Sequence, residues 1–210
     1  MDSNIQKFKD FLEVRFPNLK NIKHSFEFCS KYGDNKYLVN SQMKTINFDK
    51  LTEWYTESTQ KPQSADSLSF NDKYVYLIEF KSGDPTTHNN KLEKLIDDVI
   101  GKINDSDATL SNLYLEAFGN ESDRLKENFC LVVDSKQMGI TPLTTTLTSL
   151  SLKHNSFSSE KDRIIFEKIY PDLKLGVQEA EHYSKIEIWY SELFDQYLQV
   201  KRIESSVPIT

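Results

Sequence analysis

The chain has 210 residues and a formal net charge of −6, with 38% hydrophobic, 12% aromatic and 28% charged residues. These values exclude an intrinsically disordered chain and favour one globular domain with a buried core. No apolar stretch reaches the roughly eighteen residues of a membrane span, and the first residues lack the order of a secretory signal. A cytoplasmic protein without a membrane partner is therefore expected, in which Cys29 and Cys130 are reduced, packed thiols.

The acidic balance counts against a nucleic-acid binder, because non-specific DNA affinity comes mostly from Lys and Arg side chains that replace counterions on phosphates. It does not exclude one. A group of carboxylates around a metal ion lowers the net charge, and a local basic strip or a partner subunit still supplies phosphate contacts.

The N-terminal part of the chain predicts two helices and a hairpin. Apolar residues at helical spacing indicate an amphipathic helix over residues 5–16, which Pro17 ends. Aromatic segments on both sides of Gly33 predict a hairpin within residues 24–48, and residues 49–57 predict a short helix.

A second hairpin is the strongest local signal. Residues 65–70 and 74–81 are two extended runs, and the polar connector Asn71-Asp72-Lys73 suits a tight turn between them. The sequence therefore predicts two adjacent antiparallel strands here.

Two helices are predicted after this hairpin. Residues 89–103 carry apolar side chains at near-ideal helical spacing, and a separate helix is expected over residues 108–118. Ser106 or Asp107 would cap the second helix, and Gly119 would end it.

The C-terminal part predicts further elements of both kinds. The continuous apolar run at 129–133 is typical of a central strand buried on both faces. Residues 143–152 predict a helix, 163–166 a strand and 186–198 a C-terminal helix, and residues 204–210 are expected to form a flexible tail.

The strand predicted at 74–81 places charge where both faces are mostly apolar. Strand alternation puts four side chains on one face: Val75, Leu77, Glu79 and Lys81. A carboxylate and an ammonium group on a buried face are costly unless they are paired or bind a metal.

Asp66 lies across the hairpin from Glu79 if the two strands pair around their connector. Two carboxylates that converge on one point favour a hard divalent cation such as Mg²⁺ or Mn²⁺, and the backbone carbonyl of Phe80 is a candidate third oxygen ligand. Such an ion polarises a phosphodiester and activates water, while Lys81 orients that water or neutralises the developing charge. The alternative is a solvent-facing ion pair of Glu79 and Lys81 with no function.

Asp66, a hairpin, the segment Ile78-Glu79-Phe80-Lys81 and a following helix together resemble the PD-(D/E)xK nuclease superfamily, with Ala65 at the place of the motif's Pro. The resemblance covers roughly residues 64–104. It implies that Asp66 and Glu79 bind Mg²⁺ and that Lys81 assists catalysis.

The resemblance also implies an α/β fold. This fold is a restriction-endonuclease-like mixed central sheet flanked by helices in the order α-β-β-β-α-β, with extra C-terminal helices. Residues 1–203 would form a single nuclease-like domain in which residues 129–133 are the last core strand.

Further site residues are open on the sequence alone. Many members of the superfamily carry a Glu on the first helix near the metal; Glu13 is the nearest candidate, and Glu27 and Glu57 are no better supported. Lys91 and Lys94 either contact phosphate or belong to a solvated helix face. His88, in the loop after the motif, is more typical of an ordinary loop histidine.

The expected function is a divalent-metal-dependent endo- or exodeoxyribonuclease, with DNA as its partner, in defence, restriction, recombination or repair. One alternative is a catalytically unused nuclease-fold interaction module, a complex subunit or an anti-defence protein, that binds a protein partner or a second copy of itself. A DNA mimic is a weaker alternative, because its acidic residues should form continuous stripes and here Lys residues interrupt them.

Overall fold

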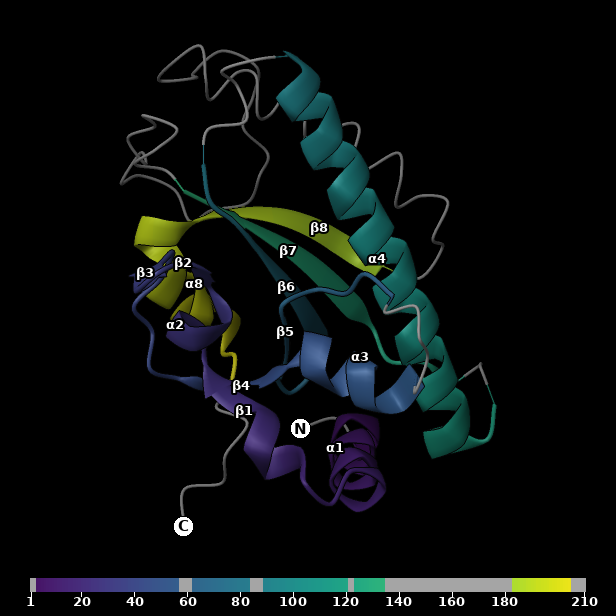
Figure 1. Cartoon of the computed structure of the whole chain (residues 1–210). Coiled ribbons are helices and arrows are strands. Elements are labelled where there is room, and N and C mark those ends of the chain that lie inside the picture. Colours follow the sequence, from purple (N-terminus) through teal and green to yellow (C-terminus); the bar gives the residue numbers. More distant parts are fainter. Residues whose placement is uncertain (1–2, 57–61, 84–88, 121–122, 135–182, 205–210) are drawn as a thin grey trace.

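A computed structural model of the chain describes residues 3–56, 62–83, 89–120, 123–134 and 183–204, with the side chains of residues 89–92 excepted. These residues form an α/β structure around a six-stranded mixed sheet in the order β1-β4-β5-β6-β7-β8 (Figure 1). Neighbouring strands are antiparallel from β1 to β6 and parallel from β6 to β8. The strands are β1 Lys23–Ser25, β4 Lys44–Asn47, β5 Ser67–Phe70, β6 Val75–Lys81, β7 Glu127–Val133 and β8 Tyr183–Tyr190.

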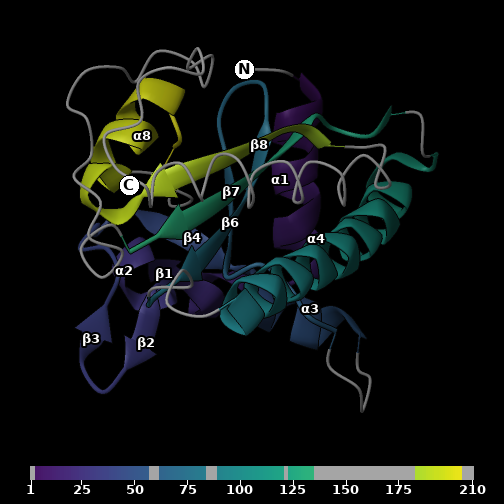
Figure 2. The ribbon, with the colours of Figure 1, turned by 90° about the horizontal axis from the view of Figure 1, so that it is seen from above.

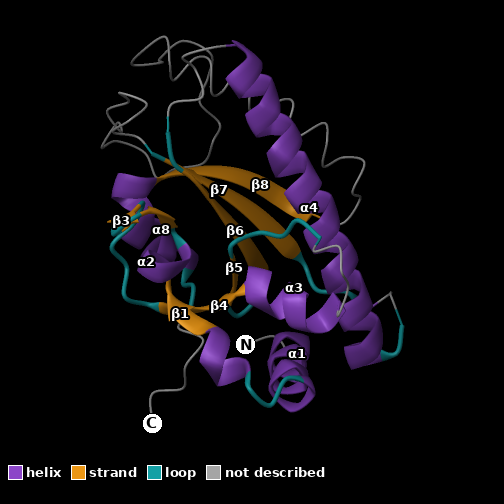
Figure 3. Ribbon diagram, viewed as in Figure 1, coloured by secondary structure: helices purple, strands orange, loops and turns teal. Residues whose placement is uncertain are grey.

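Helices cover both faces of the sheet (Figure 3). One buried cluster joins the sheet to α1, α3 and α4, and a second joins its other face to α2 and α8. The α-helices are α1 Ser3–Arg15, α2 Phe26–Cys29, α3 Phe48–Thr56, α4 Asn89–Phe118 and α8 Phe194–Lys201, and the 3₁₀ segments are η1 Leu19–Ile22 and η5 Ser191–Leu193. A separate hairpin consists of β2 Lys31–Gly33 and β3 Lys36–Tyr37.

Several elements confirm the sequence predictions. The N-terminal helix buries Ile5, Phe8 and Leu12 as its spacing indicated, and α3 matches the helix predicted from residue 49. The turn after Gly33 is present, although the aromatic segment before it forms the single helical turn α2 because Ser25 caps it by accepting the Phe28 N–H.

The strand β6 is buried on both faces, as predicted. Val75 and Leu77 belong to the cluster under α1, α3 and α4, whereas Tyr76, Ile78 and Phe80 belong to the cluster under α2 and α8. By alternation Glu79 lies on the same face as Val75 and Leu77, beneath α4. β7 is also buried along its full length, and it lies between β6 and β8, so it is not the edge of the sheet.

The prediction of two helices after the β5–β6 hairpin is wrong, because α4 is one continuous helix of 30 residues. The polar residues expected to cap a second helix instead meet partners from elsewhere in the chain. The Ser106 hydroxyl accepts the N–H of Ala65, and Asp107 pairs with Arg124. Gly119, with φ at 81°, ends α4 as predicted.

The C-terminal helix predicted over residues 186–198 is correct only in its second half. Tyr183–Tyr190 forms the strand β8, parallel to β7. Ile186 and Ile188 enter one core cluster and Trp189 the other, so these apolar residues follow a period of two. Helical offsets alone misled here, since a strand buried on both faces is apolar in any period.

Other predictions have mixed outcomes. Cys29 and Cys130 are free thiols, as expected. Glu204 forms an isolated antiparallel β-bridge with Phe70 and an ion pair with Lys9, so the predicted flexible tail does not begin at this residue. The predicted elements at 143–152 and 163–166 lie outside the described residues. Among the residues that the structure describes, no helix is long and apolar enough to cross a membrane.

Candidate metal centre

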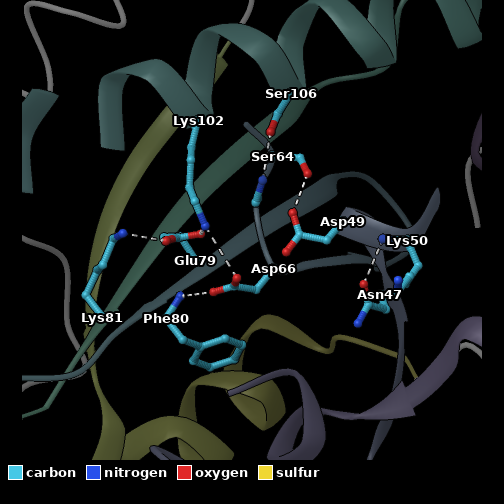
Figure 4. A network of polar contacts seen from close by, with 11 residues as sticks. Asn47, Asp49, Lys50, Ser64, Asp66, Glu79, Phe80, Lys81, Lys102 and Ser106 are labelled. Atoms are coloured by element: carbon cyan, nitrogen blue, oxygen red, sulfur yellow. Dashed lines mark hydrogen bonds and ion pairs between the residues drawn. The ribbon is translucent and has the colours of Figure 1, made fainter. Parts of the chain in front are cut away.

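The register of the β5–β6 hairpin brings the two predicted carboxylates together. Ser67 pairs with Ile78 in a regular antiparallel ladder, so Asp66, immediately before β5, faces Glu79. The N–H of Phe80 donates a 2.7 Å hydrogen bond to Asp66 Oδ2. The juxtaposition expected from the sequence is therefore present, and it needs no bulge in the hairpin (Figure 4).

Lys102, on α4, reaches down to both carboxylates. Its Nζ donates to Glu79 Oε2 at 2.8 Å and lies 3.5 Å from Asp66 Oδ1. Figure 4 shows this ammonium group between the two acids. Lys102 is not among the site residues predicted from the sequence, although a signal is present: it lies three residues after Val99 and four before Ser106, within the buried stripe of its helix.

Lys81 contacts the other oxygen of Glu79. Its Nζ lies 3.1 Å from Glu79 Oε1, and the Lys81 side chain is 25% exposed whereas that of Glu79 is 1% exposed. Burial of Glu79 rules out the alternative of a solvent-facing ion pair. Glu79 is a buried carboxylate that holds one ammonium group on each oxygen, and Lys81 lies on its solvent side.

The surroundings of Asp66 disfavour its negatively charged form. Burial raises the pKa of Asp66 well above its usual range, and the charges of Glu79 and Asp49 raise it further, against Lys102 and the Phe80 N–H. Burial lowers the pKa of Lys102, but the carboxylates of Glu79 and Asp66 outweigh this and raise it overall. An additional cation at this point would therefore stabilise the charged form of Asp66.

Asp49 is a third acid whose charge acts on the site. It lies in the first turn of α3, and one of its oxygens accepts a 2.5 Å hydrogen bond from the Ser64 hydroxyl. An acidic residue in a first helical turn is ordinary because it complements the helix dipole, so nothing in the sequence singled it out.

The donor set fits a hard cation. Asp66, Glu79 and the main chain of Phe80 offer oxygen atoms, and Mg²⁺ is commonly bound through one or two carboxylates while keeping several waters. In the part of the chain that the structure describes, no group of three or more His, Cys, Asp or Glu residues is arranged to hold a metal ion. The two carboxylates suit a hydrated Mg²⁺ or Mn²⁺ ion, which takes few ligands from the protein.

Glu13 does not join this site. Its exposed side chain lies on α1 and forms an ion pair with Lys23 at 3.2 Å. The face of α1 that packs on the core carries Ile5, Phe8 and Leu12, and Glu13 is not among the buried residues of this helix. The prediction of Glu13 as a fourth acidic ligand is therefore wrong, and Glu27 accepts from Gln42 instead.

Two of the remaining candidate residues, Lys91 and Lys94, lie near the start of α4. Lys94 is exposed there, whereas the side chain of Lys91 lies outside the described residues, as do His88 and Glu57. Phosphate contact by Lys91 and Lys94 stays a prediction.

Comparison of the chain with protein-family models, with curated proteins and with solved structures gives no match.

Proposed function

We propose that this protein is a divalent-metal-dependent nuclease of the PD-(D/E)xK type that hydrolyses phosphodiester bonds of DNA. The observation that carries the proposal is the facing pair Asp66 and Glu79, with Lys81 two residues further along the same strand. The order of elements agrees with the α-β-β-β-α-β pattern if α1, β4, β5, β6, α4 and β7 are its members. In that case η1, β1, α2 and the β2–β3 hairpin are insertions between α1 and β4, and α3 is an insertion between β4 and β5.

Asp66, Glu79 and the Phe80 main chain would hold the ion. A bound Mg²⁺ or Mn²⁺ would supply a polarised phosphodiester and an activated water molecule. Lys102 would have to withdraw its ammonium group from the carboxylates, since two cations at one point repel each other, and its flexible stem allows this movement.

We assign to Lys81 the contact with the phosphate group that reacts. Its ammonium is held by Glu79 on one side and is partly exposed on the other, where a substrate can approach. In that position it orients the attacking water or neutralises charge that develops on the phosphate oxygens.

The same geometry supports a second candidate, a nuclease-fold interaction module without catalysis. Lys81 and Lys102 together balance the charges of Asp66 and Glu79, so the four residues also form a self-contained network around the buried Glu79 carboxylate. The two candidates differ in metal dependence: a module that uses the network only for stability neither binds Mg²⁺ there nor cleaves DNA.

Lys81→Ala tests the nuclease directly. We expect it to lower the rate of DNA cleavage by about 100-fold or more, which is typical for loss of one charge-stabilising group. Lys102 still pairs with Glu79 in this variant, so the protein should stay folded. The measurement is cleavage of plasmid and single-stranded DNA with Mg²⁺, Mn²⁺ or EDTA.

The matched control is Lys20→Ala, which removes an exposed lysine from η1 and should cleave DNA like the unmodified protein. Strong metal-dependent cleavage that persists in Lys81→Ala would refute the assignment of this site.

A further inference from the structure

Three exposed aromatic side chains lie within ten residues of the chain, on α2 and the β2–β3 hairpin. Phe28 is 50% exposed, Tyr32 42% and Tyr37 36%. Among the described residues, the other large apolar side chains with such exposure lie singly on four different helices: Val14, Trp54, Leu115 and Val200. We call Phe28, Tyr32 and Tyr37, with the lysines beside them, the aromatic surface.

Lysines alternate with these rings. Lys31 and Lys36 directly precede Tyr32 and Tyr37, and Lys31 is the cross-strand partner of Tyr37. Both lysines are exposed. Residues 24–44 contain three lysines and two acidic residues, so this segment is locally positive in a chain whose net charge is −6.

The third lysine acts on the aromatic ring pair at the other end of the surface. His24 stacks on Phe28 with ring centroids 4.3 Å apart. Partial burial and then the charge of Lys44 lower the pKa of His24, so the positive field extends to this pair. Tyr32 and Tyr37 thus each have a lysine beside them in the sequence, and Phe28 has the stacked His24.

The aromatic surface is held in a fixed position. The Leu38 N–H donates to the Ser30 carbonyl at 3.1 Å, and the Val39 N–H donates to the Ser30 hydroxyl at 3.2 Å. These bonds fasten the end of the hairpin to the end of α2, and Figure 2 shows the hairpin projecting from the body of the protein. A surface held in this way loses little conformational entropy when it binds a ligand.

Exposed rings interleaved with cations suit single-stranded nucleic acid. Unpaired bases stack on aromatic side chains without regard to sequence, and lysines contact the phosphates between them. A duplex keeps its bases stacked on each other and has no free ring to offer. We propose that α2 and the β2–β3 hairpin bind single-stranded DNA, and this binding does not depend on the proposed nuclease function.

The experiment is a titration of a fluorescent single-stranded oligothymidylate with the full chain in EDTA at low salt, followed by anisotropy. We expect the double variant Tyr32→Ala, Tyr37→Ala to bind at least about tenfold more weakly, since each stacked base contributes measurably to affinity. Trp54→Ala, which removes an aromatic side chain of similar exposure from α3, is the matched control and should bind like the unmodified protein.

Equal binding by the double variant, absence of oligonucleotide binding, or equally tight binding of a duplex of the same length would each overturn the proposal. Thermal unfolding of the double variant should be unchanged, because both tyrosines are exposed. EDTA separates this result from catalysis. Oligonucleotide binding without any metal-dependent cleavage would support the aromatic surface and refute the nuclease. Metal-dependent cleavage together with unaltered binding by the double variant would support the nuclease and refute the aromatic surface.

Discussion

Lys102→Met is expected to lower the free energy of unfolding by about 3–5 kcal/mol when the protein is measured in EDTA. The methionine keeps the packing of the stem under α4 but removes the cation shared by Glu79 and Asp66. Glu79 is almost fully buried and would keep only Lys81, and Asp66 would face it without a lysine between them. Urea unfolding monitored by circular dichroism measures the change.

Divalent cations should restore much of this loss. A metal ion that binds only the folded state stabilises that state. In Lys102→Met no ammonium group of residue 102 competes with the ion for the two carboxylates. We therefore expect millimolar Mg²⁺ or Mn²⁺ to raise the stability of Lys102→Met more than that of the unmodified protein. Lys20→Met, on the exposed side of η1, is the control for a lost surface charge. An equal effect of the ions on both proteins would favour the interaction module.

Arg124→Met is expected to destabilise the fold by a similar amount, about 3–5 kcal/mol. Arg124 donates to both oxygens of Glu127, at 3.0 and 3.1 Å, and also to Asp107 and Ser111 on α4. Glu127, at the start of β7, has no exposed surface. The arginine thus joins the longest helix to a central strand, and its loss leaves a buried carboxylate without a cation.

This loss should depend on pH in a defined direction. Burial raises the pKa of Glu127 from 4.5 to about 7, against the opposing charge of Arg124. Because this pKa is higher in the folded than in the unfolded state, protonation of Glu127 favours the folded state. This contribution to stability is complete below about pH 4.5 and is lost as the pH rises through about 7. Removal of Arg124 raises this pKa further, so the deficit of Arg124→Met should be larger at about pH 8 than at about pH 6.

Glu127→Gln provides the control for the pH effect. Its stability should lack the decline between about pH 4.5 and 7 that Glu127 causes in the unmodified protein. The explanation is contradicted if Arg124→Met shows the same deficit at both pH values, measured by urea unfolding in matched buffers.

The candidate site shows which parts of a structure short-range patterns determine. Alternation along residues 74–81 placed Glu79 and Lys81 on one buried face, and the polar connector set the hairpin register that brings Asp66 opposite Glu79. Both are local properties of adjacent strands. Lys102 and Asp49 reach the same point from helices, and only the packing of α3 and α4 on the sheet determines that.

The errors in the fold have the same origin. Ser106 and Asp107 are good capping residues in isolation, yet their partners Ala65 and Arg124 come from other segments and keep α4 continuous. Glu13 was a candidate because of its helix alone, and the orientation of that helix turned it to Lys23. The strand β8 was hidden because its residues are apolar on both faces, a pattern that a helix shares.

Titration of Mn²⁺ into the full chain, followed by calorimetry, tests the central claim most directly. The proposed nuclease site predicts that a single Mn²⁺ ion binds to the unmodified protein and that binding is lost when Asp66→Asn and Glu79→Gln are combined. Neutral amides of the same shape keep the hairpin contacts but remove the charge that holds the ion. Binding that is unchanged in the double variant, or a complete absence of binding by the unmodified protein, would contradict the assignment of Asp66 and Glu79 as a metal centre.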